Sequence, residues 1–141
     1  MQTVTTGALE LMEGWQDSDA DGTRVRFNFP INKLSGAESS AVVYFELEPG
    51  QHLGRHTDSA EETLYIVAGT AEAEAGGERQ RVAAGDMVVI PAMAPHGVAN
   101  VGDDTVKVVG FFSAAEVTST FEEPMQPVGA SVFEQAAPAP A

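Results

Sequence analysis

Short segments with alternating polar and apolar residues, separated by turn signals, run through the middle of the chain. Residues 70–75 alternate strictly, with alanines on one side and polar side chains on the other, and the dipeptide Gly76-Gly77 follows. Such alternation is typical of a strand with one buried face, and two glycines between such segments are typical of a tight hairpin. The regular spacing predicts an all-β sandwich or barrel, with strands at 23–29, 41–47, 63–67, 70–75, 78–82, 87–90, 96–101 and 105–112.

The two ends of the chain lack this regular pattern. Residues 1–22 are predicted to be a separate N-terminal segment, in which 8–12 could be a short helical turn or an outlying strand. Residues 23–113 are predicted to be the β-barrel. Residues 114–141 contain several prolines, so we expect an extended C-terminal tail whose end, 136–141, is disordered.

Length, charge and cysteine content exclude several classes of protein. A chain of 141 residues suits one domain, and its formal net charge of -14 provides no basic surface for nucleic acid or for an anionic membrane. There is no cysteine, which removes disulfides and thiolate metal sites. Residues 1–13 have no signal-peptide pattern, and no apolar run approaches a membrane span, so a cytoplasmic protein is expected.

The histidines and one nearby carboxylate form the most informative pattern for chemistry. All three histidines lie between positions 52 and 96. His56 and Asp58 share one face of a strand, and Glu62 shares the apolar face of the next strand. A buried carboxylate requires a partner, and a cation is one solution. With His96 returning from another strand, two histidines and one carboxylate would make the facial arrangement typical of non-haem Fe(II).

These residues also resemble a known family. Eight residues stand at the spacings of the two motifs of the cupin superfamily: Gly50, His56, Glu62, Gly69, Gly85, Pro91, His96 and Asn100. The resemblance implies a single-domain, jelly-roll barrel of the double-stranded β-helix type. It also implies a metal site made by His56, Asp58, Glu62 and His96. Because cupins carry out many different reactions, the resemblance does not fix the activity.

Two positions depart from the family pattern. Asp58 stands where a second histidine is usual. It could complete a ligand set of two histidines and two carboxylates, or it could cap backbone N–H groups in a turn. Met93 stands where glycine is usual. We therefore expect that its turn does not freely adopt positive φ and that an apolar side chain lies near the mouth of the pocket.

His52 has no position in the family pattern. It could be a substitute nitrogen ligand, a general base or a loop residue after Pro49-Gly50, and the loop reading is preferred. If strand alternation holds, Arg55 and Glu61 face away from the metal.

Three functions compete. The first is a metal-dependent, dioxygenase-like enzyme that acts on a small organic molecule, with Glu62 serving as both ligand and catalytic base. The second is a metal-dependent isomerase or cyclase that uses the same ligands without redox change. The third is a non-catalytic barrel that binds a small ligand.

The resemblance also implies a cofactor and a partner. We expect one divalent metal ion per chain, with Fe or Mn favoured by carboxylate ligands and with Zn or Ni as alternatives. A homodimer is expected, in which the apolar residues of 121–133 could cover a neighbouring protomer. These residues could equally fold over their own barrel.

Overall fold

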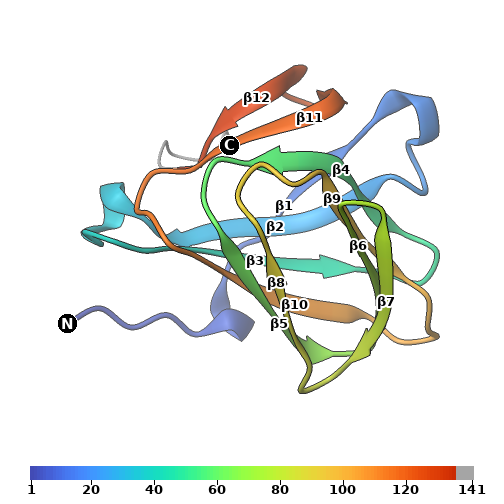
Figure 1. The fold of residues 1–141 in the computed structure, drawn as a ribbon, viewed down its shortest axis with the longest axis horizontal. Helices are drawn as coiled ribbons and strands as arrows, with labels where there is room; N and C mark the ends of the chain where they lie inside the picture. The colour runs from blue at the N-terminus through green and yellow to red at the C-terminus, as the bar shows by residue number, and fades with distance from the viewer. Residues whose placement is uncertain (136–141) are drawn as a thin grey trace.

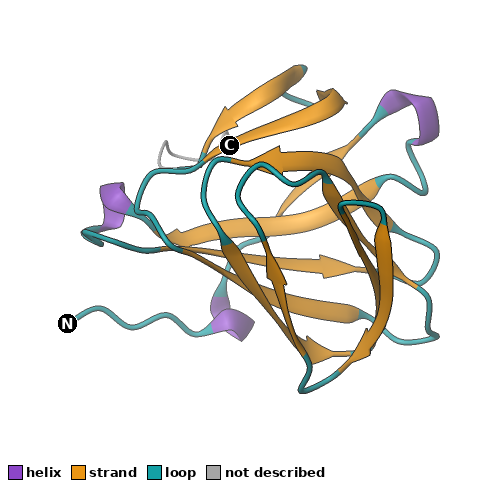
Figure 2. Ribbon diagram, in the orientation of Figure 1, coloured by secondary structure: helices purple, strands orange, loops and turns teal. Residues whose placement is uncertain are grey.

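Two antiparallel sheets face each other in the computed structural model, which describes residues 1–135 (Figures 1 and 2). One sheet has the order β1-β2-β3-β10-β5-β8 and the other the order β12-β11-β4-β9-β6-β7. This arrangement confirms the expected all-β jelly-roll barrel. The strands are β1 (Met12–Trp15), β2 (Arg24–Ile31), β3 (Ala41–Leu47), β4 (His52–Asp58), β5 (Glu62–Ala68), β6 (Thr70–Ala75), β7 (Glu78–Ala83), β8 (Met87–Ile90), β9 (His96–Asn100), β10 (Val106–Phe112), β11 (Thr118–Met125) and β12 (Ala130–Glu134).

The core fills the space between the two sheets. Strand β10 shows how alternation places residues there, because Val106, Val108 and Phe112 are buried while Lys107 and Phe111 are exposed. Strands β3, β6 and β8 have the bounds expected from sequence, and the other expected strands agree to within one or two residues. The most deeply buried large side chains are Leu47, Leu64, Ile66, Ile90, Val106, Val108 and Val117.

The C-terminal segment differs from the extended tail expected from sequence. Strands β11 and β12 pair with each other, and β11 also pairs with β4, so this hairpin extends the sheet that carries His56 and Asp58 (Figure 1). Pro124 lies in β11 beyond the residues that pair with β4, so its missing N–H breaks none of those bonds. The expected disordered end, 136–141, lies outside the described residues.

The N-terminal segment contributes a strand. Of the two alternatives for residues 8–12, the structure has a 3-10 turn at Thr6–Ala8 and then β1, which pairs with β2. The backbone of Trp15 also exchanges two hydrogen bonds with Gln126, at 3.2 and 2.7 Å. The segments before and after the expected barrel therefore meet at Trp15 and Gln126, and both sheets extend beyond the barrel expected at 23–113.

Among the residues with positive φ, Gly69 and Met93 show most clearly how the backbone restricts the choice of residue. Gly69 has φ 85°, and a Cβ there would lie 2.8 Å from the carbonyl oxygen of Thr105, so this position requires glycine. Met93 has φ 64°, and the expectation that it would avoid positive φ is therefore wrong. Its N–H donates a 2.8 Å hydrogen bond to the carbonyl of Asp58, which compensates part of the strain. Its side chain is 59% exposed and does not line the cavity described below.

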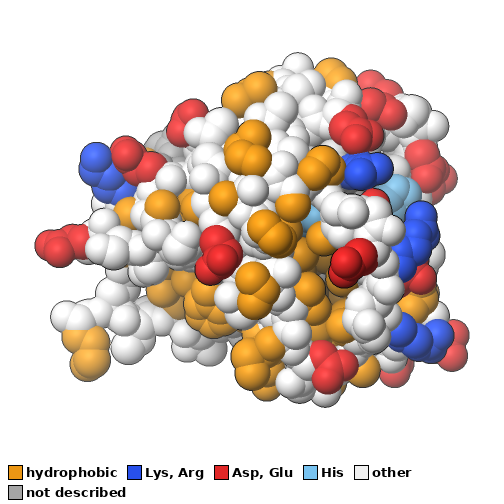
Figure 3. Space-filling view, in the orientation of Figure 1, with side chains coloured by type: hydrophobic (Ala, Val, Ile, Leu, Met, Phe, Trp, Pro, Cys, Tyr) orange, Lys and Arg blue, Asp and Glu red, His pale blue; other side chains and the backbone are white. Residues whose placement is uncertain are grey.

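An exposed apolar patch covers the outer face of β5, β8 and β10. Tyr65, Val67, Met87, Val89 and Phe111 form it, and Figure 3 shows hydrophobic side chains gathered over this part of the molecule. The expected homodimer stays a prediction. Within residues 1–135, no helix is long and apolar enough to cross a membrane.

Candidate metal centre

Four ionisable side chains converge inside the barrel from three strands. His56 and Asp58 lie two residues apart on β4, so alternation points both inward. Glu62 is the first residue of β5, and His96 is the first residue of β9. All four are buried, with exposed fractions between 2% and 6%.

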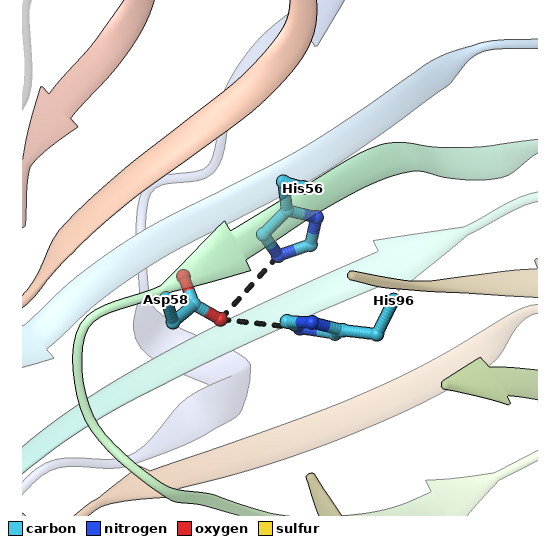
Figure 4. A group of neighbouring side chains, drawn as sticks. All are labelled: His56, Asp58 and His96. Carbon is cyan, nitrogen blue, oxygen red and sulfur yellow. Dashed lines mark ion pairs between the residues drawn. The ribbon is translucent and has the colours of Figure 1, made fainter. Parts of the chain in front are cut away.

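The side-chain atoms of this cluster face one another at short range. Oδ2 of Asp58 lies 3.1 Å from Nε2 of His96 and 3.5 Å from Nε2 of His56 (Figure 4). His56, Asp58 and His96 each offer one atom within 4.8 Å of the others, so this trio could hold a metal ion. Oε1 of Glu62 lies 3.5 Å from Nε2 of His96, which places a fourth donor beside the trio.

Backbone carbonyls fix the orientation of both imidazole rings. Nδ1 of His56 lies 2.8 Å from the carbonyl oxygen of Gly54, and Nδ1 of His96 lies 2.9 Å from that of Ala94. A carbonyl only accepts, so each Nδ1 carries a proton, and each ring turns Nε2, the atom that would bind a metal ion, toward the cluster. Such outer bonds are typical of histidines that bind metals.

Asp58 is held through one of its two carboxylate oxygens. The hydroxyl of Ser119 donates a 2.5 Å hydrogen bond to Oδ1, and Gln135 donates a 2.5 Å bond to Ser119. Oδ2 is buried and has no hydrogen-bond partner. A buried carboxylate oxygen that faces two imidazole nitrogens is costly unless a proton or a cation lies among them. The donor set therefore fits a divalent metal ion.

The pKa values of Asp58, Glu62 and His96 indicate how protons are distributed in the cluster when no metal ion is bound. Burial by itself would raise the pKa of Asp58, but the neighbouring imidazoles of His56 and His96 favour its charged form and hold the pKa below its ordinary value. Burial opposes the charged form of His96, but the carboxylates of Asp58 and Glu62 raise its pKa to about 10. Burial raises the pKa of Glu62. Without a metal ion, His96 therefore carries a proton at neutral pH.

A glycine opposite Glu62 leaves room for its carboxylate. Gly110 lies on β10, and a Cβ built there would collide with Oε2 of Glu62 and would lie 2.8 Å from Cγ1 of Val43. The interior is therefore shaped to contain this acidic side chain next to His96.

The remaining polar residues near the motif lie away from the cluster. The register between β4 and β9 shifts between Leu53 and His56, so His52 does not continue the face that carries His56. Nε2 of His52 instead lies 2.9 Å from the hydroxyl of Thr23. His52 is the first residue of β4 rather than a loop residue. Arg55 and Glu61 are exposed, as expected.

The cluster lies in the wall of a cavity of about 490 Å³. This volume is in the range of small-molecule sites. Phe121 stacks on the ring of His56 with 4.5 Å between centroids, and Phe133 packs edge-on against Phe121. The aromatic side chains that line the cavity are Trp15, Phe27, Phe29, Phe45, Phe112, Phe121 and Phe133.

Sequence reasoning missed the residues that the C-terminal hairpin adds to this site. Ser119, Phe121 and Gln135 all lie beyond the last motif residue, Asn100. The structure alternates buried and exposed residues along β11, but the polar sequence Thr118-Ser119-Thr120 shows no apolar alternation, so no clear signal marked Ser119.

Comparison with known proteins places these observations in a family. The model of the cupin domain family matches residues 43–112. No curated protein matches the sequence. An oxalate decarboxylase from Lactobacillus farciminis is similar in structure, with TM-score 0.66 and 23% identity over 70% of this chain. This chain spans only 31% of that protein.

Two further solved structures resemble a larger part of the chain. A predicted oxalate decarboxylase from Thermotoga maritima has TM-score 0.67 and 17% identity, over 80% of this chain and 99% of that one. The polyketide cyclase RemF from Streptomyces resistomycificus has TM-score 0.63 and 19% identity, over 79% of this chain and 78% of that one. These likenesses concern the fold. By its family match over residues 43–112 and by its fold, this chain contains a small cupin-type domain.

Proposed function

We propose that this protein is a metal-dependent enzyme that acts on a small organic molecule. Its ligands would be His56, Asp58, Glu62 and His96, and its substrate would bind in the adjoining cavity. The observation that carries the proposal is that Oδ2 of Asp58, buried and without a hydrogen-bond partner among the described residues, faces Nε2 of both His56 and His96 in the cavity wall.

The donor set favours a hard divalent ion. Two neutral imidazoles and two carboxylates together balance the charge of such an ion, and carboxylate oxygens favour Fe(II) or Mn(II). Oxalate decarboxylase from Bacillus subtilis, a cupin relative with TM-score 0.62 and 20% identity, has Mn(II) centres. Zn or Ni would fit the same nitrogens and would point to chemistry without redox change.

Dioxygenase-like chemistry is the first reaction class that we propose. The bound ion would act as a Lewis acid and as a template for substrate and O₂. The chain keeps both imidazoles oriented through Gly54 and Ala94. Glu62, which lines the cavity, is placed to accept a proton from a substrate hydroxyl.

A cyclase or isomerase is the second candidate. The apolar cavity has room for a molecule of several rings, and a polyketide cyclase is among the proteins of similar fold. The same residues would then polarise a carbonyl group and move a proton without consuming O₂.

Metal analysis tests the proposal first. Untagged protein purified without chelators should contain about one Fe or Mn per chain. Asp58→Ala should reduce that content, whereas Asp103→Ala, which removes an exposed carboxylate, should leave it unchanged. Protein that stays metal-free after reconstitution would contradict the proposal and favour a non-catalytic, ligand-binding barrel.

Oxygen uptake separates the two reaction classes. Metal-loaded protein is screened against phenols and enolisable ketones in an oxygen electrode, with products followed by mass spectrometry. Turnover with O₂ consumption supports the dioxygenase. Turnover without it supports the cyclase or isomerase.

A further inference from the structure

The walls of the cavity offer no free positive side chain to balance an anion, because protonated His96 already faces the carboxylates of Asp58 and Glu62. Among the described residues that line it, none is Lys or Arg, and the carboxylates are Glu13, Asp58 and Glu62. An anionic group placed against these walls would lose water without gaining a cationic partner that is not already paired with a carboxylate. A metal ion would already be balanced by its own carboxylate ligands.

Arg24 contacts two residues that line the cavity, Glu13 and Trp15, but its guanidinium is already engaged. Arg24 donates from Nη1 to Glu13 at 2.8 Å and from Nε to the carbonyl of Ala20 at 2.8 Å. Its guanidinium also lies 4.8 Å from the centroid of the Trp15 ring. Arg24 itself does not line the cavity, so it does not supply a positive charge inside it.

Gln135 presents a hydrogen-bond acceptor that has no partner among residues 1–135. A carboxylate only accepts, so the hydroxyl of Ser119 must donate to Asp58, and its oxygen must accept from Gln135. This chain fixes the amide orientation and leaves Oε1 of Gln135 buried and unpaired. Gln135 is 6% exposed and lines the cavity. A buried acceptor of this kind is satisfied when a ligand brings a donor.

We infer that the cavity binds an uncharged, largely aromatic molecule that carries a hydroxyl or N–H group directed at Gln135. The aromatic walls stabilise planar rings by offset and edge-on contacts, as Phe121 and Phe133 already make with each other. This inference rests on the proposed function only in taking the cavity as the substrate site.

Three naphthalenes test charge and donor separately. 2-Naphthol is neutral and carries a donor, 2-methoxynaphthalene is neutral without one, and 2-naphthoate is an anion at neutral pH. Each is titrated by calorimetry into the full chain after chelator treatment, so that naphthoate cannot coordinate a metal ion. We expect 2-naphthol to bind once per chain and naphthoate to bind at least about tenfold more weakly.

The donor effect is tested at Gln135. 2-Methoxynaphthalene should bind several-fold more weakly than 2-naphthol to the unmodified protein, because it leaves the amide oxygen unpaired. In Gln135→Met this difference should disappear. A difference that persists in Gln135→Met would overturn the assignment of the donor to this residue.

A pair of matched variants locates the charge effect. Met12 lines the cavity, whereas Met87 is exposed on the outer face of β8, so Met12→Lys and Met87→Lys add the same charge at different places. Only Met12→Lys should reduce the ratio of the dissociation constant of naphthoate to that of 2-naphthol. Equal effects of both variants would overturn the inference, because the preference would then reflect overall charge.

The outcomes separate this inference from the proposed enzyme activity. Naphthoate binding as tightly as 2-naphthol, or no binding by any of the three compounds, overturns the substrate class even if the protein holds a metal ion. Conversely, a protein that takes up no metal but binds in the expected order contradicts the enzyme and supports the inferred ligand class.

Discussion

The hydroxyl of Ser119 donates a 2.5 Å hydrogen bond to Oδ1 of Asp58, and this bond joins the C-terminal hairpin to the candidate metal centre. Asp58 has a shorter side chain than the histidine that is usual at its position. With Oδ1 held by Ser119, Oδ2 is directed at the two imidazoles. The hairpin therefore acts as support for the site, and it does so through a residue outside both sequence motifs.

Ser119→Ala should weaken metal binding by about tenfold, because loss of an outer hydrogen bond allows a ligand to rotate. The measurement is competition for Mn(II) against a chelating dye. Ser18→Ala is the matched control, since Ser18 also bonds a carboxylate, that of Glu123, but at the surface. Equal affinity of the two variants would show that Ser119 does not position Asp58.

The motif residues and most strands could be predicted from sequence because they depend on local patterns. Alternation and glycine turns gave the bounds of β3, β6 and β8. The support from Ser119 could not be predicted in this way, because that residue lies 61 positions from Asp58 and meets it only through the pairing of β11 with β4. Prolines at 124 and 127 also favoured an extended tail over a strand.

The position of His52 could not be predicted for a different reason. Its spacing from His56 would place both on one face of an unbroken strand, but the register shift after Leu53 interrupts that relationship. A shift of this kind leaves no clear mark in the sequence. The three-dimensional pairing is therefore needed to separate a ligand from its neighbour.

His96→Ala should abolish tight metal binding, with a loss of at least about a hundredfold, while the barrel stays folded. Metal content and thermal unfolding are measured on the same preparation. His52→Ala is the control, because it removes a histidine whose partner is Thr23 and not the cluster. Stoichiometric metal retained in His96→Ala would rule out this ligand set.

Metal affinity should rise with pH. The pKa of His96 is raised from 6.5 to about 10 in the metal-free protein, so at neutral pH an ion must displace its proton. The dissociation constant for Mn(II) should therefore fall by up to about tenfold per pH unit between about pH 7 and 8.5. A flat profile over this range would mean that no proton leaves on binding.

The metal-free protein should show the opposite dependence in its stability. A pKa raised by folding contributes stability that is fully present below about pH 6.5 and is lost as pH rises toward 10. The midpoint of thermal unfolding of chelator-treated protein should therefore decline across this range. His96→Ala should lack that part of the decline, and an equally steep decline in the variant would assign it to other groups.

Met93→Gly should stabilise the protein. A non-glycine residue with φ 64° carries strain of about 1–2 kcal/mol, and glycine removes it at an entropic cost of about 0.5–1 kcal/mol. Because the side chain is 59% exposed, little packing is lost. The net gain of about 0.5–1 kcal/mol should raise the midpoint of thermal unfolding by a few degrees.

Met87→Gly is the matched control for this change. Met87 is 70% exposed and lies in β8, where glycine should lower stability by about 0.5–1 kcal/mol because the extended backbone gains nothing from positive φ. The two Met→Gly variants should therefore shift the unfolding midpoint in opposite directions. Met93→Val should lower it, since a branched side chain tolerates positive φ poorly. Shifts of the same sign for Met93→Gly and Met87→Gly would show that the turn at Met93 carries no strain that glycine relieves.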